Sequence, residues 1–229
     1  MTLTVPCLFG LESLVADEMR RLDLKNVRAE NGRVHCEGTL ADIARLNVNL
    51  RCGARVLMEL GSFPARDFEA LFQGVYALPW ENYIPRDGEF PVKGYSLNSQ
   101  LHSVPACQSI VKKASAKRLG EKYGVETLPE SGSRYQIQFS IIKDVATLYL
   151  DTSGEGLYKR GYRAKNMGAP LRETLAAALV TLSRYRGKDP FCDPFCGSGT
   201  IPIEAALIAK NRAPGLDRSF AAQKWKNMD

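Results

Sequence analysis

Apolar and polar positions along residues 1–52 follow the periods of short strands and amphipathic helices. The dipeptide Asn31-Gly32 stands between two short strands and favours a tight hairpin turn. The order of strand, helix, hairpin and helix predicts a ferredoxin-like domain. Its expected elements are a strand at 3–9, a helix at 10–22, the hairpin, and a helix at 39–50 that Thr39 caps.

Residues 53–153 alternate strands and helices again and predict a second α+β domain. Asp67 is expected to cap a helix whose apolar face, including Phe68 and Phe72, is buried. Trp80 either closes an edge of the core or stacks on a base. The expected elements are strands at 54–61 and 90–95, a polar loop at 98–103, a helix at 104–122, and two strands joined across Lys143-Asp144.

The last segment, 154–229, begins with a glycine-rich stretch and continues into a helix that opens at Pro170 and ends at Gly187. Its expected buried stripe consists of Leu171, Leu175, Ala178, Leu179 and Leu182. Apolar residues then lead into Asp193, and two glycines precede another helical pattern, which predicts strand, tight turn and helix. Open α/β sheets bind ligands at such strand ends, where helix N-terminal amides face the ligand.

The 229 residues carry a formal net charge of +6 with a sequence pI near 9.0, which favours an acidic partner such as nucleic acid. Basic residues gather on the helix at 104–122, either as a solvated face or as a surface for RNA. A second basic strip at 157–172 holds no acidic residue. This strip is either a linker between domains or part of an RNA path on which Tyr158 and Tyr162 could stack.

The cysteines and histidines are few and scattered. Six cysteines form no Cys-x-x-Cys pair and only two histidines occur, so no metal site is expected. Cysteines without a disulfide framework indicate reduced thiols and a cytoplasmic protein. No signal peptide is recognisable, and no apolar stretch is long enough to span a bilayer, so no membrane partner is expected.

The string Asp-Pro-Phe-Cys-Gly-Ser-Gly-Thr-Ile at 193–201 resembles motif I of S-adenosylmethionine-dependent methyltransferases, in the version found in RNA guanine-N2 methyltransferases. The helix start Arg-Glu-Thr at 172–174 resembles the one beside the cofactor in this family, although an ordinary first-turn capping set explains it nearly as well. Cys196 is better explained as a small side chain tucked into the loop than as a nucleophile. The cofactor residues that the resemblance implies are Asp193, Phe195, Gly197, Ser198, Gly199, Thr200, Arg172, Thr174 and Glu204.

Residues 91–114 resemble the THUMP domain, a small RNA-binding module. Lys93-Gly94, Asn98-Ser99 and the run from Cys107 to Ala114 carry this likeness. The basic segment after it resembles the connector between THUMP and methyltransferase domains. The RNA contacts that the two resemblances imply are Lys93, Asn98, Ser99, Lys112, Lys113, Lys117, Lys159, Arg160 and Arg163.

Together these resemblances imply α+β and α/β architecture: a ferredoxin-like domain at 1–52, a THUMP domain at 53–153, and the beginning of a Rossmann-like methyltransferase domain at 154–229. They imply a methyltransferase that modifies the exocyclic N2 amine of a guanine in 23S ribosomal RNA. The family's Asn/Asp-Pro-Pro-Tyr catalytic motif is absent from the 229 residues, so we expect no catalytic residue here and an inactive N-terminal fragment. The alternatives are a transfer RNA guanine-N2 methyltransferase and a stand-alone, non-catalytic RNA-binding module.

Overall fold

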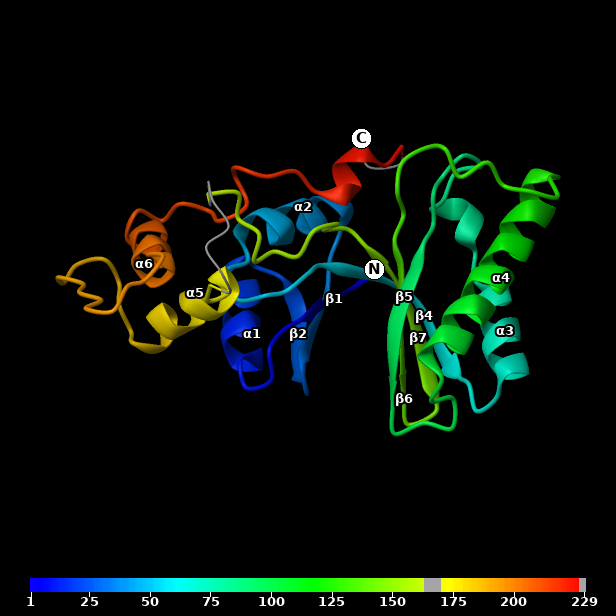
Figure 1. The fold of residues 1–229 in the computed structure, drawn as a ribbon, viewed down its shortest axis with the longest axis horizontal. Coiled ribbons are helices and arrows are strands. Elements are labelled where there is room, and N and C mark those ends of the chain that lie inside the picture. Colours follow the sequence, from blue (N-terminus) through cyan, green and yellow to red (C-terminus); the bar gives the residue numbers. More distant parts are fainter. Residues whose placement is uncertain (163–169, 227–229) are drawn as a thin grey trace. The chain divides into compact units, whose positions relative to one another are not determined.

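A computed structural model describes residues 1–162 and 170–226. The chain forms two compact units. The first unit joins Met1–Val56 to Glu155–Phe220, and the second joins Leu57–Gly154 to Ala221–Asp229 (Figure 1).

The first unit begins with the predicted ferredoxin-like order of elements. Its three strands lie in the order β2-β3-β1, with antiparallel pairing, and helix α1 packs on β2 and β3. Gly32 turns the β2–β3 hairpin with φ of 74°, as the Asn-Gly dipeptide predicts. Thr39 caps α2 in a capping box with Asp42. The bounds are β1 Thr2–Pro6, α1 Glu12–Arg21, β2 Lys25–Glu30, β3 Arg33–Glu37 and α2 Leu40–Asn49.

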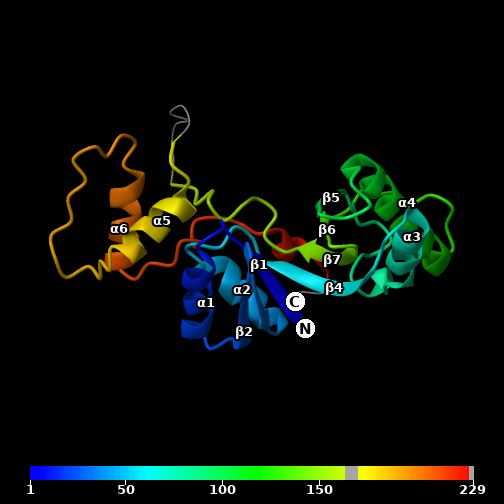
Figure 2. The same ribbon diagram turned by 90° about the horizontal axis from the view of Figure 1, so that it is seen from below.

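The second unit is a sheet in the order β4-β7-β6-β5 with two helices on one face, as the two views in Figures 1 and 2 show. Strands β5 and β6 pair in parallel and the other pairs are antiparallel. Lys143 and Asp144 both have positive φ and make the β6–β7 turn, as predicted. The bounds are β4 Leu57–Pro64, α3 Phe68–Ala77, the 3-10 turn η1 Trp80–Asn82, β5 Val92–Leu97, α4 Val104–Tyr123, β6 Ile137–Ile142 and β7 Val145–Asp151.

Helix α3 confirms its predicted cap, because the Asp67 side chain accepts a hydrogen bond from Ala70 N at 2.7 Å. The prediction that its aromatic face is buried is wrong for Phe68, which is 41% exposed, whereas Leu71 and Val75 are buried. Helical side chains lean toward the N-terminus, so a first-turn ring projects beyond the start of the helix. Trp80 is buried and donates to Val75 O, so it closes the core.

Helices α5 (Glu173–Leu182) and α6 (Thr200–Ala209) pack against each other in the first unit. The predicted buried stripe of α5 is confirmed for Ala178 but wrong for Leu179 and Leu182, which are 43% and 57% exposed. Leu171 and Leu175 are half-buried. The buried residues of α5 are Glu173, Thr174, Ala176, Ala177, Ala178 and Val180. Most of these side chains are small, which lets α5 approach its neighbours closely.

The strand expected just before Asp193 is also not found, since residues 188–193 belong to no strand. An extended segment becomes a strand only when a neighbour pairs with its backbone. No strand of the described chain pairs with these residues.

The C-terminal part of the described chain docks on the second unit. After the turn η2 (Ala221–Lys224), the Trp225 ring stacks on Tyr135 with centroids 5.0 Å apart. Trp225 Nε1 donates to Arg134 O at 2.9 Å, and Lys226 pairs with Asp87 at 3.0 Å. This segment therefore belongs to the core of the second unit, and periodicity along the chain does not predict that.

Candidate functional site

The turn from Asp193 to Thr200 leads directly into the N-terminus of α6. Gly197 and Gly199 have φ of 52° and 75°, a region that favours glycine. Gly199 N donates to Cys196 O at 2.8 Å, and Gly199 is the N-cap of α6. The predicted tight turn and helix are therefore confirmed, with the positive end of the helix dipole directly behind the turn.

Side chains in this turn hold it in shape. Asp193 Oδ1 accepts a hydrogen bond from Phe195 N at 3.1 Å, and the hydroxyls of Ser198 and Thr200 lie 3.2 Å apart. Phe195 is 93% exposed, and Thr200 is buried. Cys196 is exposed, so the prediction of a side chain tucked into the loop is wrong.

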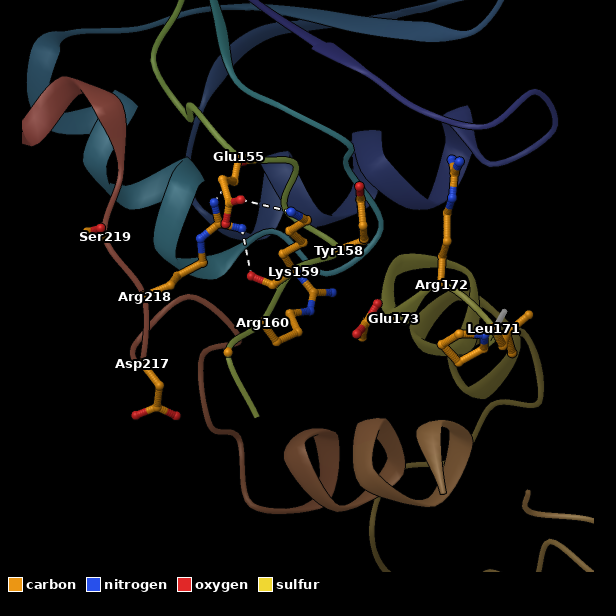
Figure 3. A pocket seen from close by; sticks show the side chains of 12 residues that line it. Glu155, Tyr158, Lys159, Arg160, Leu171, Arg172, Glu173, Asp217, Arg218 and Ser219 are labelled. Carbon is orange, nitrogen blue, oxygen red and sulfur yellow. Dashed lines mark hydrogen bonds and ion pairs between the residues drawn. The ribbon is translucent and has the colours of Figure 1, made fainter. Parts of the chain in front are cut away.

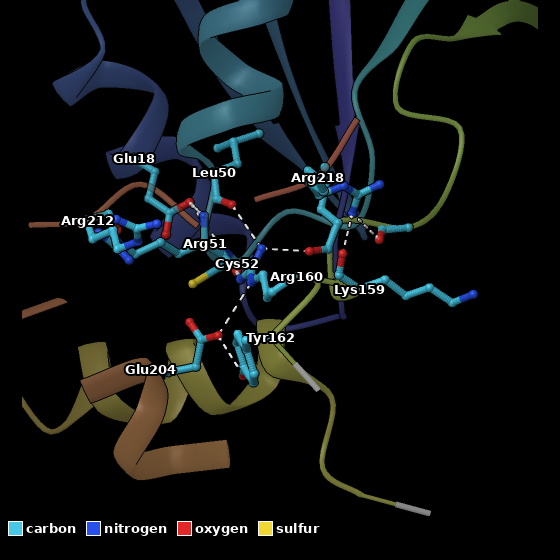
Figure 4. A network of polar contacts seen from close by, with 12 residues as sticks. Glu18, Leu50, Arg51, Cys52, Lys159, Arg160, Tyr162, Glu204, Arg212 and Arg218 are labelled. Carbon is cyan, nitrogen blue, oxygen red and sulfur yellow. Dashed lines mark hydrogen bonds and ion pairs between the residues drawn. The ribbon is translucent and has the colours of Figure 1, made fainter. Parts of the chain in front are cut away.

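Glu204 lies one turn into α6 and faces the interior (Figure 4). Its Oε1 accepts from Tyr162 OH at 3.0 Å and from Arg160 Nε at 3.4 Å, while Oε2 has no hydrogen-bond partner among the described residues. Burial raises the pKa of this carboxyl, and the nearby Arg160 charge partly opposes the rise. The carboxylate therefore makes an internal contact, and its role as a cofactor ligand stays a prediction.

Arg160 is 3% exposed, and its guanidinium donates hydrogen bonds to partners inside the first unit. Besides Glu204, it donates to Leu157 O at 2.7 Å, Leu50 O at 3.3 Å and Arg51 O at 2.5 Å. The guanidinium thus ties α6 to the chain that follows α2. The RNA contact expected of Arg160 stays a prediction, and it would require these buried bonds to open.

Arg172 and Thr174 lie at the start of α5. Arg172 is its N-cap residue but makes no side-chain capping bond, and Thr174 is buried. The Arg172 guanidinium lies over the Tyr158 ring, 5.4 Å from its centroid. Arg172 and Tyr158 both line a cavity of about 850 Å³ (Figure 3). None of residues 193–200 is among the described residues that line it.

The predicted RNA residues of the second unit lie on β5, the loop after it, and α4. Lys93, Asn98 and Lys113 are exposed, whereas Ser99 is half-buried. The Ser99 hydroxyl donates to Leu97 O and accepts from Asp144 N, so it braces the loop.

Lys112 and Lys117 on α4 have partners within the second unit. Lys112 Nζ lies 2.7 Å from the Glu130 carboxylate and 3.4 Å from the centroid of the Phe90 ring. Lys112 therefore has an internal structural role, and its contact with RNA stays a prediction. Lys117 is exposed and pairs weakly with Glu121 at 4.0 Å.

The basic strip at 157–172 also contains both exposed side chains and side chains with partners inside the protein. Lys159 is exposed and pairs with Glu155 at 2.8 Å. The Tyr162 hydroxyl bonds to Glu204, whereas the Tyr158 ring faces the cavity described above. Arg163 lies outside the described residues.

The six cysteines are free thiols, which agrees with the absence of a disulfide framework in the sequence. Within residues 1–162 and 170–226, no group of three or more histidine, cysteine and acidic side chains could hold a metal ion. Among the helices in those same ranges, none combines the length and apolarity that crossing a membrane requires.

Three domain families match successive parts of the chain. Residues 2–57 match the RlmL ferredoxin-like domain, residues 65–151 the THUMP domain, and residues 160–229 the RMKL-like methyltransferase domain. The chain is therefore similar, in order, to a ferredoxin-like, a THUMP and a methyltransferase domain, and its curated relatives carry the names of RNA methyltransferases.

Two curated relatives carry names of that class. "Putative RNA methyltransferase YpsC" of Bacillus subtilis is 46% identical over 227 residues, which cover 98% of this chain and 59% of the relative. "Ribosomal RNA large subunit methyltransferase K/L" of Psychromonas ingrahamii is 36% identical over 229 residues, which cover 98% of this chain and 30% of the relative. The chain thus spans well under two thirds of each relative.

Solved structures agree with the fold. A "predicted N6-adenine-specific DNA methylase" from Listeria monocytogenes superposes with a TM-score of 0.95 at 49% identity over 100% of this chain and 60% of that one. "SMU.472, a putative methyltransferase complexed with SAH" gives a TM-score of 0.93 at 45% identity with the same coverage. TrmN from Thermus thermophilus shares the fold, with a TM-score of 0.67 at 22% identity, over 91% of this chain and 62% of that one.

Proposed function

We propose that the chain binds S-adenosylmethionine at the turn from Asp193 to Thr200 and structured RNA through its THUMP domain. The observation that carries the cofactor assignment is the pair of positive-φ glycines, Gly197 and Gly199, directly before the N-terminus of α6. In a chain with a methyltransferase-family match, such a turn brings backbone amides close to a ligand.

The residues of this turn fit the cofactor. An added side chain at Gly197 would meet no atom within 4 Å, so the glycine is needed for its backbone conformation rather than for room inside the protein. Amides at the positive N-terminus of α6 can donate hydrogen bonds to the carboxylate of the cofactor. The negative carboxylate of Asp193 attracts the positively charged groups of the cofactor. When bound, the cofactor supplies a methyl group on a sulfonium. One structural neighbour is described as complexed with SAH, the demethylated form of this cofactor.

We propose 23S ribosomal RNA as the partner, with Lys93, Lys113 and Lys117 contacting phosphates. These lysines are exposed on β5 and α4, and neither Lys93 nor Lys113 has an acidic partner in the described chain. Phosphate contacts give affinity without sequence information, so binding should weaken steeply with salt. The free thiols fit a cytoplasmic location.

We further propose that the activity of the whole protein is methylation of the exocyclic N2 amine of a guanine. Such an amine is a weak nucleophile, so catalysis depends on holding its nitrogen in line with the methyl group. The residues that would hold the amine belong to the Asn/Asp-Pro-Pro-Tyr motif, which the 229 residues do not contain. The chain of 229 residues should therefore bind RNA and cofactor without turnover.

The test uses radiolabelled S-adenosylmethionine with 23S ribosomal RNA and, in parallel, transfer RNA. We expect the 229-residue chain to bind ribosomal RNA more tightly than transfer RNA, with affinity that falls as salt rises, and to transfer no label. Tighter binding of transfer RNA would support the alternative substrate. Labelled guanine in either RNA would contradict the assignment of this chain as non-catalytic.

A further inference from the structure

The cavity in the first unit presents an arginine stacked on a tyrosine at the start of a helix (Figure 3). Arg172 is exposed, and its guanidinium lies 5.4 Å from the centroid of the Tyr158 ring. No carboxylate in the described chain pairs with this arginine. An arginine held by an aromatic face but not by an acid keeps its donors available for an anion.

Two other arginines of the cavity are engaged inside the first unit. Arg160 is buried against Glu204, and Arg218 donates to the carbonyls of Gly156, Lys159 and Glu155. Lys159 pairs with Glu155, but both of these side chains are exposed, so a ligand can compete for this lysine. Within the described lining, Arg172 and Lys159 are therefore the cations that a ligand in this cavity can reach.

Of the three acidic residues in the described lining, Glu155 is exposed and pairs with Lys159, and the other two are less available. Asp217 is held by Arg212 through both carboxylate oxygens, at 2.9 and 3.0 Å. Glu173 is 6% exposed. Arg172 is the N-cap residue of α5, and its own side chain makes no capping bond. A helix N-terminus favours an anion, so it adds to the attraction of Arg172.

We propose that this cavity binds one nucleotide of the RNA substrate, with a base stacked at Tyr158 and a phosphate held by Arg172 and Lys159. The volume of about 850 Å³ is that of a small-molecule site, which spans about 300–1,000 Å³. The tyrosine and arginine supply the stacking surface and the charge that single-stranded RNA requires. The inference rests on the proposed function and assigns Arg172 to RNA rather than to the cofactor.

Two binding measurements on the 229-residue chain separate these roles. Fluorescence anisotropy with labelled 23S ribosomal RNA reports RNA affinity, and equilibrium dialysis with labelled S-adenosylmethionine reports cofactor affinity. Arg172→Gln and Tyr158→Leu should each weaken RNA binding about fivefold or more, as expected for loss of one base contact. Cofactor affinity should stay within about twofold of the unsubstituted chain, because no residue of the Asp193–Thr200 turn lines the cavity.

Two matched controls accompany these variants. Tyr158→Phe keeps the ring and should retain RNA binding. Lys25→Gln removes an exposed positive charge on β2 and should lower affinity only slightly. If Arg172→Gln weakens cofactor binding and leaves RNA binding unchanged, the inference is overturned and Arg172 belongs to the cofactor site.

Crosslinking of 4-thiouridine-substituted ribosomal RNA to the unsubstituted chain gives a readout that does not depend on a variant folding. Trypsin cuts after Lys143 and Lys159, so a crosslink at Tyr158 appears in the peptide 144–159. Crosslinks there support the inference, and crosslinks confined to other peptides overturn it. Failure of the unsubstituted chain to bind RNA would contradict the proposed function itself, whereas RNA binding that both cavity variants retain would contradict this inference alone.

Discussion

Arg160 and Glu204 meet inside the first unit with side chains that are 2% and 0% exposed, although 44 positions separate them along the chain. The guanidinium also holds the Leu50 and Arg51 carbonyls, so one side chain joins the end of the ferredoxin-like region to the helix that follows the candidate cofactor turn. A buried ion pair of this kind does not by itself stabilise a fold. Removing one partner is nevertheless destabilising, because the other charge is left buried without a partner.

Arg160→Ala should therefore lower the free energy of unfolding of the first unit by about 3–5 kcal/mol. The substitution leaves Glu204 without its cation and leaves three backbone carbonyls without their donor. Urea unfolding measures the loss, and hydrogen exchange assigns it to the first unit. Arg20→Ala removes an exposed pair with Asp17 and is the control, with little expected effect. Equal losses in both variants would contradict the role given to Arg160.

Glu204→Gln tests the pH dependence of this contact. The pKa of Glu204 is raised above its ordinary value of 4.5 by burial, so the folded chain holds this proton more tightly than the unfolded chain does. Its contribution to stability is fully present below pH 4.5 and falls as pH rises through the folded pKa.

The glutamine variant cannot titrate, so its stability relative to the native chain should rise as pH increases from about 4 to 8. Unfolding curves of both proteins across that range give the difference directly, and groups common to both cancel. A difference that stays constant with pH would show that the Glu204 pKa is the same in the folded and unfolded chains.

Lys112 and Lys113 are neighbours on α4, and we expect the first to stabilise the second unit and the second to contact RNA. Lys112→Gln should destabilise the second unit by about 1–2 kcal/mol, because the lysine bonds to Glu130 and lies on the Phe90 ring. Lys113→Gln should leave stability unchanged and weaken RNA binding, with a shallower salt dependence. Thermal unfolding and RNA titrations at two salt concentrations measure both effects. The assignment fails if Lys112→Gln changes only RNA affinity.

Gly94→Ala tests the close approach of β5 and β6. A Cβ at Gly94 would lie 2.4 Å from the Phe139 ring and carbonyl oxygen, which forces the two strands apart. We expect a loss of about 1–3 kcal/mol in the stability of the second unit, as for other overpacked sites. Lys93→Ala on the same strand is exposed and is the control. Hydrogen exchange of the β6 amides reports the change, and unaltered protection in Gly94→Ala would contradict the packing described.

Features fixed by a few adjacent residues were predictable from the sequence. The Asn31-Gly32 and Lys143-Asp144 turns and the caps at Thr39 and Asp67 depend on local backbone chemistry, and each is where the sequence predicts it. The turn through Gly197 and Gly199 belongs to the same group, because both glycines are needed for their own backbone angles.

Features that depend on distant partners were not predictable. The helical period of α4 predicts that Lys112 and Lys113 point about 100° apart around the helix. It does not predict that Lys112 is the lysine that contacts Glu130 and Phe90. Trp225 reaches Tyr135 from the far end of the chain. Likewise, a basic strip in the sequence gives no sign that Arg160 is buried while Arg172 is exposed.

Binding of S-adenosylmethionine to the turn from Asp193 to Thr200 is the central claim, and equilibrium dialysis with the labelled cofactor tests it most directly. The 229-residue chain should bind the cofactor saturably, and Asp193→Asn should weaken binding about tenfold, because the amide removes a negative charge that would attract the cationic cofactor. Equal binding by the native chain and Asp193→Asn, or no binding by the native chain, would contradict the claim.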